Sequence, residues 1–241
     1  MRVKVTISYD GTEFYGSQEQ KDRKTVVGVL HSAFKKINIS KPAIMSGRTD
    51  RGVHSTGQVF HLDIPDYWKI ETFLYALKRA IPKTISIRDI KEVDNNFHSR
   101  FSAKRRVYRY IFSTSSRNPF EEKFVTFIER ERFDFSKIQN SISLFKGVHN
   151  FHNFRKVGSE NSSDFREIFK TQTYKFGRYY ILRFEANSFL RSQVRLMVGA
   201  LLSIGYGKLS KKNLSDMIDG EKRVLQKIAP PNGLYLTKVI Y

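Results

Sequence analysis

The chain has 241 residues, of which 40% are hydrophobic, so it is long and apolar enough to fold around a substantial core. Lysine and arginine total 43 against 23 aspartates and glutamates, a formal net charge of +20 that favours a polyanionic partner, with nucleic acid the leading candidate. The absence of cysteine excludes disulfide bonds, thiolate zinc sites and cysteine nucleophiles.

The sequence shows no sign of export or membrane insertion. Residues 1–5 alternate charged and apolar side chains, unlike the apolar region of a signal peptide. No apolar run approaches the roughly 18 residues of a membrane-spanning helix. We therefore expect a cytoplasmic protein without a membrane partner.

The first half of the chain alternates between two hydrophobic periods. Apolar residues recur at every second position in the expected strands and at helical spacing in the expected helices. Thr25 is a suitable N-cap for the first helix, and Pro82 ends the second. In chain order we expect a strand over residues 3–7, a helix over 26–37, a strand over 60–64, a helix over 73–81 and a strand from 85.

The second half repeats this order less regularly. The polar stretch Gly147–Arg166 predicts a mobile loop. Strands with alternating polarity have one covered face, which favours an α+β fold over a doubly wound parallel sheet. The expected elements are a strand over 107–112, a helix over 138–145, a strand over 179–184, a long helix over 190–202, a short helix over 214–218 and a strand from 234.

Asp50 is the strongest candidate for a reacting group. It lies between Arg48 and Arg51 in the polar segment Gly47–Val59. A carboxylate is costly to desolvate and repels phosphate, so in a cationic protein it favours chemistry over binding. A neighbouring guanidinium would lower its pKa and keep it ionised, as a nucleophile or base requires. Alternatively, Asp50 only shapes an Asx turn before Gly52.

His54 is a second candidate, as a general base or a metal ligand, although a hydrogen-bonded loop histidine is the preferred interpretation. His149 and His152 are close in sequence, but neither cysteines nor spaced carboxylates complete a metal site, so we expect no metal. Phosphate-binding, dinucleotide-binding and serine-hydrolase motifs are also missing from the sequence.

Cations alternate with tyrosines over Lys104–Tyr110. In a strand, Arg106 and Tyr108 share one face, whereas Arg109 lies on the other. Cations beside an aromatic ring suit an unstacked base and its phosphate backbone. An edge strand protected by charges is an equally good interpretation.

Arg191 and Arg195 are four residues apart and so share one face of the predicted long helix. That helix is otherwise apolar, so Arg195 on its core side needs a partner, and Asp50 is the carboxylate that we would choose. The alternative is that Arg195 extends to solvent.

The segment Gly47–Val59 resembles the active-site segment G-R-T-D-x-G-V-H-x-x-G-Q-V of the tRNA pseudouridine synthase family known as TruA, at every fixed position. Further similar segments follow in order along nearly the whole chain: Tyr9–Thr12, Arg100–Ala103, Tyr108–Tyr110, Gly147–Phe151, Phe189–Gly199 and Gly233–Leu236. The chain departs from the family pattern at Ser17, Val27, Arg191–Gln193 and Leu196.

The resemblance implies an enzyme that isomerises a flipped-out uridine to pseudouridine in the anticodon stem-loop of tRNA, at positions 38–40, as a homodimer and without a cofactor. It also implies two ferredoxin-like subdomains whose mostly antiparallel sheets join into one, with a basic cleft between them. Residues 1–104 would carry the catalytic aspartate loop, and residues 105–241 the tyrosine strand and the arginine helix.

Roles for single residues also follow from the resemblance. Asp50 would be the nucleophile or base, attacking C1′ or C6 or deprotonating C2′. Arg195 would form an ion pair with Asp50, and Tyr108 would stack on the uracil and handle a proton. Arg48 would help to hold the displaced nucleotide. From the residues themselves we further expect His54, Arg106 and Arg109 to bind substrate together with Arg48 and Tyr108. A non-catalytic RNA-binding or RNA-folding protein on the same scaffold is the alternative.

Overall fold

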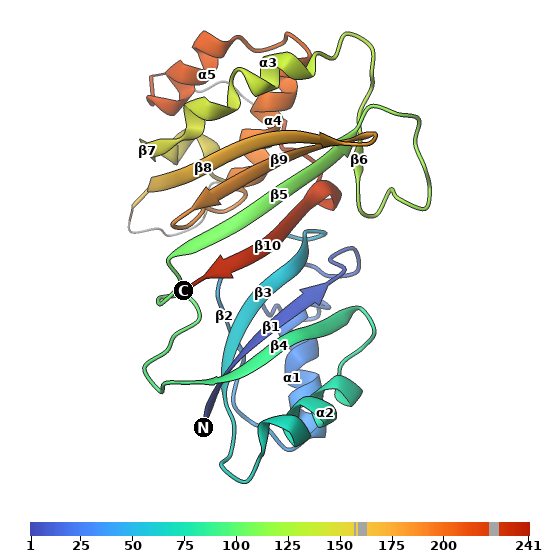
Figure 1. The fold of residues 1–241 in the computed structure, drawn as a ribbon, viewed down its shortest axis with the longest axis vertical. Helices are drawn as coiled ribbons and strands as arrows, with labels where there is room; N and C mark the ends of the chain where they lie inside the picture. The colour runs from blue at the N-terminus through green and yellow to red at the C-terminus, as the bar shows by residue number, and fades with distance from the viewer. Residues whose placement is uncertain (157, 159–162, 222–226) are drawn as a thin grey trace. The chain divides into compact units, whose positions relative to one another are not determined.

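The computed structural model describes residues 1–156, 158, 163–221 and 227–241, and it divides into two compact units. The first unit comprises Met1–Lys104 together with Tyr235–Tyr241, and the second comprises Arg105–Leu234 (Figure 1). The sequence-based division assigned residues 235–241 to the second part of the chain. The structure places them in the first unit, because the last strand pairs there with a strand that begins at His54.

The first unit has the strand and helix order β-α-β-β-α-β of a ferredoxin-like motif, completed by a strand from the end of the chain. Its sheet has the strand order β4-β1-β3-β10, with β2 paired to β3. β1 is antiparallel to β3 and β4, whereas β10 is parallel to β3. The elements are β1 (Arg2–Tyr9), α1 (Val26–Lys36), β2 (Ile44–Met45), β3 (His54–Asp63), α2 (Ile70–Ala80), β4 (Ile85–Val93) and β10 (Leu234–Ile240).

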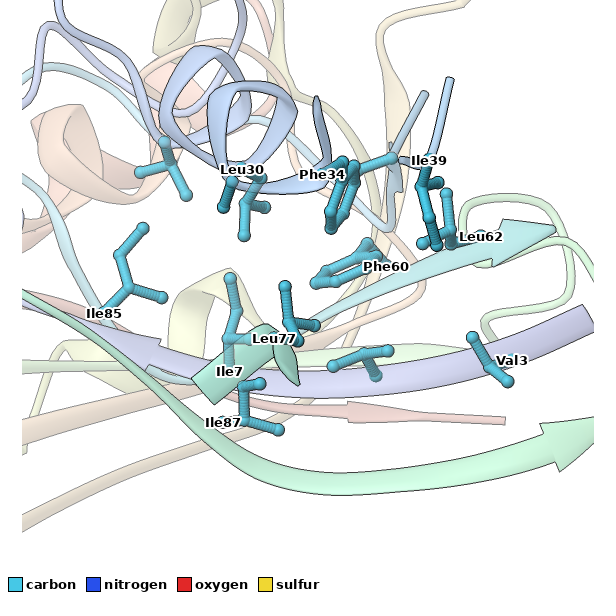
Figure 2. Packing of buried hydrophobic residues seen from close by; sticks show 14 of the residues in the cluster. Val3, Ile7, Leu30, Phe34, Ile39, Phe60, Leu62, Leu77, Ile85 and Ile87 are labelled. Carbon is cyan, nitrogen blue, oxygen red and sulfur yellow. The ribbon is translucent and has the colours of Figure 1, made fainter. Parts of the chain in front are cut away.

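A hydrophobic core holds α1 and α2 on one face of this sheet. Val3, Val5 and Ile7 alternate along β1 and are completely buried, in the same cluster as the apolar faces of both helices (Figure 2). Phe34 of α1 packs against Phe60 of β3 with ring centroids 6.0 Å apart. Burying each large apolar side chain contributes about 1.5–3 kcal/mol, so this cluster fixes the helices on the strands.

The second unit has the strand order β5-β9-β8-β7, with the short β6 paired to β5. The pairs β5–β9, β9–β8 and β8–β7 are all antiparallel. The elements are β5 (Arg105–Ser113), β6 (Thr126–Phe127), α3 (Phe135–Gln139), β7 (Gly147–Asn150), β8 (Phe165–Phe176), β9 (Tyr179–Ala186), α4 (Gln193–Gly205), α5 (Lys211–Ile218) and 3₁₀ turns at Ile142–Phe145, Phe151–Phe154 and Pro231–Gly233.

Aromatic residues form much of the second core. Tyr110 and Phe112 alternate along β5 and are fully buried, as is Phe184 on the paired strand β9. Phe145 packs edge-on against Phe154, with ring centroids 5.3 Å apart. Both units thus combine mainly antiparallel strands with helices, which confirms the α+β prediction. None of the helices in the described ranges is long and apolar enough to span a bilayer.

Two predicted helices differ from the structure. The helix expected over 138–145 is α3 followed by a separate 3₁₀ turn, and the Ser141 hydroxyl there donates back to the carbonyl of Lys137 at 2.8 Å. The long helix expected over 190–202 begins only at Gln193, because Ser192 has a left-handed φ of 60°. Arg191 therefore precedes the helix and does not share a helix face with Arg195.

The expectation of a mobile loop over Gly147–Arg166 is wrong for its two ends. Residues 147–150 form β7, which pairs with the start of β8, and residues 151–154 form a 3₁₀ turn. Residues 157 and 159–162 lie outside the described part of the chain. A short strand in a polar sequence carries no hydrophobic period, so local pattern did not indicate it.

We predict that His61 makes the first unit less stable in acid. The ring is 5% exposed, and its Nδ1 accepts from the backbone N–H of Ser99 at 3.1 Å. Burial, with smaller effects of Arg2 and His98, lowers its pKa to about 4. Because the folded pKa lies below the unfolded value, protonation of His61 favours the unfolded chain. The free energy of unfolding is therefore highest above about pH 6.5 and decreases as the pH falls towards 4.

NMR titration should show the His61 ring neutral down to about pH 5, and a pKa near 6.5 would contradict this prediction. In denaturant unfolding, His61→Gln should reduce the loss of unfolding free energy between pH 7 and pH 4.5 by roughly 1–2 kcal/mol relative to the unsubstituted chain.

Candidate active site

The sequence-predicted site residues are divided between the two units. The first unit carries Arg48, Asp50 and His54, on the loop between β2 and β3 and at the start of β3. The second unit carries Arg106, Tyr108 and Arg109 on β5 and Arg195 on α4.

Three hydrogen bonds fix Thr49, the residue before Asp50. Its Oγ1 lies 2.8 Å from the hydroxyl of Tyr9. Its backbone N–H donates to Oγ of Ser17 at 2.8 Å, and its carbonyl accepts from the backbone N–H of Ser17 at 3.1 Å. Thr49, Tyr9 and Ser17 are all buried, so the bonds are shielded from water. They hold the chain on the N-terminal side of Asp50.

Burial keeps Tyr9 in its neutral form. It raises the pKa of the Tyr9 hydroxyl to about 12, and the hydrogen bond to Thr49 opposes this shift. Tyr9 is the last residue of β1, whose inner residues are buried in the core. The hydrogen bond to Thr49 therefore connects the loop that carries Asp50 to a strand that is packed in the core.

A tight turn fixes the chain on the other side of Asp50. The backbone N–H of Val53 donates to the carbonyl of Asp50 at 3.2 Å, and Gly52 has a φ of 75°, which favours glycine. The N–H of Gly52 donates to the carbonyl of Phe14 at 3.3 Å. This backbone turn leaves Asp50 partly exposed and Arg48 exposed.

Close packing of backbones also restricts this loop. Gly16 has a φ of 99°, and a Cβ there would lie 2.8 Å from the carbonyl oxygen of Thr49. A side chain at Gly16 would thus push the Asp50 loop away from the segment that holds it.

His54 is buried beside the loop and has structural contacts. Its Nδ1 accepts from the backbone N–H of Gly11 at 3.0 Å and lies 3.3 Å from Oδ1 of Asp10. Its ring stacks on Tyr235 of β10, with centroids 4.8 Å apart. These contacts agree with a hydrogen-bonded histidine that joins the residues after β1, Asp10 and Gly11, to strand β10.

In the second unit, β5 presents Tyr108 and its neighbours. Tyr108 is 9% exposed and meets Phe189 edge-on, with ring centroids 5.2 Å apart. Arg106 donates from Nη1 to the carbonyl of Asn187 at 2.7 Å. Arg109 is exposed, on the opposite face of the strand from Tyr108. The predicted alternation along β5 is therefore present.

Arg195 is anchored by backbone near the start of α4. Its Nε donates to the carbonyl of Ala229 at 2.8 Å, and its own carbonyl accepts from the N–H of Ala229 at 3.1 Å. The side chain is partly buried close to Tyr110. Burial raises the pKa of Tyr110, and the positive charge of Arg195 opposes this rise. The Tyr110 hydroxyl donates to the carbonyl of Pro230 at 3.1 Å. Arg195 thus has a fixed direction.

Sequence reasoning did not assign a site role to Tyr9 or Ser17. The available signal was a small hydroxyl residue, Ser17, at a position where the resembled family usually has tryptophan. The signal could not reveal the Ser17–Thr49 bond, because the two residues are separated by 32 positions.

A family model and curated proteins with the same name both match most of the chain. A family model described as tRNA pseudouridine synthase matches residues 5–102 and 142–241. These ranges include Asp50 and Arg195, and Tyr108 falls between them. The chain is 38% identical over 242 residues to tRNA pseudouridine synthase A of Campylobacter jejuni strain RM1221, covering 100% of both chains. It is 37% identical to the protein of that name from Wolinella succinogenes, covering 98% of this chain and 92% of that one.

The chain therefore belongs to the tRNA pseudouridine synthase family. It is accordingly an enzyme that isomerises uridine to pseudouridine. Among solved structures, a chain of a Cbf5–Nop10–Gar1 complex is similar with a TM-score of 0.38 and 13% identity, covering 83% of this chain and 45% of that one. That likeness is too weak to bear on the function.

We predict that Ser17→Ala destabilises the first unit by about 1–3 kcal/mol, because the buried N–H of Thr49 would lose its acceptor. Ser32→Ala is the matched control, since the exposed Ser32 hydroxyl donates to the carbonyl of Gly28 within α1. Denaturant unfolding of both variants measures the difference. Equal stability of the two variants would show that the Ser17 hydroxyl does not hold the loop.

Proposed function

We propose that this enzyme acts on tRNA, at uridines 38–40 of the anticodon stem-loop, with Asp50 as the reacting carboxylate. The main support is the Asp50 loop itself: a segment that matches the family's motif at every fixed position is held rigidly on both sides of its one carboxylate. A reacting group benefits from such preorganisation, because its position need not change during the reaction.

The proposed reaction conserves every atom of the uridine. The bond between N1 and C1′ breaks, the uracil turns within the site, and a bond forms between C5 and C1′. C5 then loses its proton and N1 gains one, so neither a cofactor nor an energy source is needed. An ionised Asp50 can begin the reaction by attacking C1′ or C6, or by removing a proton from C2′.

Arg195 and Tyr108 have supporting roles in this proposal. The guanidinium of Arg195 pairs with Asp50 and keeps it ionised and oriented. The bond from Arg195 Nε to Ala229 supports this role, because it fixes the direction of the side chain. Tyr108 stacks on the displaced uracil and assists deprotonation of C5, and its contact with Phe189 limits the orientations of its ring.

The net charge of +20 supports tRNA as the substrate, since cations that contact phosphates release counterions and supply much of the affinity. Extruding a stacked uridine costs a few kcal/mol, which phosphate contacts offset. We assign Arg48, Arg106 and Arg109 to tRNA binding. We do not keep His54 among these residues, because it is buried and holds Gly11 and Tyr235. As the family resemblance implies, we further propose a cytoplasmic homodimer.

We predict that Asp50→Asn abolishes pseudouridine formation while tRNA affinity stays within about tenfold, because removing a negative charge does not weaken binding to a polyanion. Release of tritium from tRNA labelled at uridine C5 measures turnover, and a gel shift measures affinity.

Asp89→Asn is the control, since it removes an exposed carboxylate from β4 of the same unit, 3.7 Å from Lys91. It should keep full turnover. Turnover by Asp50→Asn would refute the assignment, and tRNA binding by the unsubstituted chain without any product would favour a non-catalytic RNA-binding protein.

We also predict that Tyr108→Phe binds tRNA more tightly than Tyr108→Ala does. The phenyl ring keeps the stacking surface, which is worth roughly 1–3 kcal/mol per base. Because Tyr108 is largely buried, thermal unfolding of both variants is needed to show that each is folded under the binding conditions. Equal affinity of the two folded variants would argue against stacking.

A further inference from the structure

Tyr15 carries two arginines on its ring, next to the proposed reacting group. The guanidinium carbon of Arg51 lies 4.3 Å from the centroid of the Tyr15 ring, and that of Arg23 lies 4.6 Å from it. Arg51 follows Asp50 directly in the chain, and it is exposed, as is Arg23. Nothing in the proposed reaction uses these three side chains.

Backbone hydrogen bonds bring both arginines to the ring. The N–H of Tyr15 donates to the carbonyl of Lys24 at 2.9 Å, which places Arg23 beside Tyr15. On the other side, the N–H of Gly52 donates to the carbonyl of Phe14 at 3.3 Å, which places Arg51 there. The arrangement follows from the path of the backbone, so it does not depend on the choice of rotamer alone.

Two cations on one ring repel each other. Because both distances end at the same centroid, the guanidinium carbons lie within about 9 Å of each other, close to the Debye length at physiological ionic strength. The ring offsets part of this repulsion through cation–π attraction. An anion bound by both arginines would remove the rest.

Nearby carboxylates have other partners. Glu13 lies 2.6 Å from Nζ of Lys24, and Glu19 lies 3.0 Å from Nδ1 of His31. Among the described residues, no carboxylate lies within 4.0 Å of the guanidinium nitrogens of Arg23 or Arg51. Their positive charges are therefore available to a ligand.

We propose that Tyr15, Arg23 and Arg51 form a phosphate-binding site for the RNA backbone beside the target uridine. A guanidinium stacked on a ring keeps its N–H edge for bidentate bonds to a phosphate. Adjacent Cα atoms are about 3.8 Å apart, so an RNA strand whose uridine reaches Asp50 passes within reach of Arg51. This inference rests on the proposed function, because it takes Asp50 as the place where the uridine binds.

The test compares two double variants of the full chain. Arg23→Gln with Arg51→Gln removes the proposed site. Lys78→Gln with Arg79→Gln is the matched control, since it removes two exposed cations from α2 of the same unit, where Arg79 also lies over a tyrosine ring, that of Tyr75, at 5.6 Å. Affinity for an unmodified tRNA transcript is measured over a range of salt concentrations, together with pseudouridine formation at saturating tRNA.

Loss of the site should weaken tRNA binding about tenfold at 0.1 M salt. It should also reduce the slope of log affinity against log salt by about 0.7–0.9 for each lost phosphate contact. Turnover at saturating tRNA should stay within about twofold. Equal affinities and slopes for the site variant and the control would overturn the proposal.

Substitution of Tyr15 separates the stacked arrangement from charge alone. Tyr15→Phe keeps the ring and should bind tRNA as the unsubstituted chain does, whereas Tyr15→Leu should lose affinity although both arginines remain. Equal affinity of Tyr15→Leu and Tyr15→Phe would overturn the role of the ring. If Tyr15→Leu does not fold, the arginine variants still decide the proposal. Absence of pseudouridine product from the unsubstituted chain would instead refute the proposed function.

Discussion

The position of Asp50 depends on the three hydrogen bonds that tie Thr49 to Tyr9 and Ser17. All three residues are buried, so any other path of the loop would leave polar groups unpaired away from water, which is costly. Tyr9 ends a strand whose inner residues are packed in the core. The position of the loop therefore depends on β1 and on the segment around Ser17, as well as on the turn within the polar segment itself.

Carboxylates elsewhere in the molecule join elements of the fold. Asp63 of β3 binds Arg2 of the antiparallel β1 at 2.7 Å, and the hydrogen bond from Arg2 lowers its pKa. Glu185 is 6% exposed and contacts Arg105 and Arg183, and the hydrogen bond from Arg105 lowers its pKa. These acids are paired within the fold. Since the chain has far more cations than acids, a large positive excess remains for a polyanionic partner.

Elements with a strong hydrophobic period could be predicted from the sequence. The β1 alternation and the N-cap Thr25, whose hydroxyl accepts from Gly28 at 3.2 Å, were both indicated by local pattern. The start of α4 was not, because the left-handed turn at Ser192 lies inside an apolar helical period. The motif around Asp50 identified the loop, but not its attachment to Tyr9 and Ser17, because hydrogen bonds between distant residues leave no periodic signal. The roles of Arg195 and Tyr108 stay predictions.

The first unit is closed by the last residues in the chain. Tyr235 of β10 stacks on His54, Leu236 accepts a hydrogen bond from Ser55 at 2.8 Å, and a Cβ at Gly57 would lie 2.3 Å from the carbonyl oxygen of Thr237. On the ribosome, the intervening residues 105–234 are made between the two parts of this unit, which takes on the order of ten seconds. Strand β10 can therefore join β3, and complete the sheet of the first unit, only after residues 105–234 have been made.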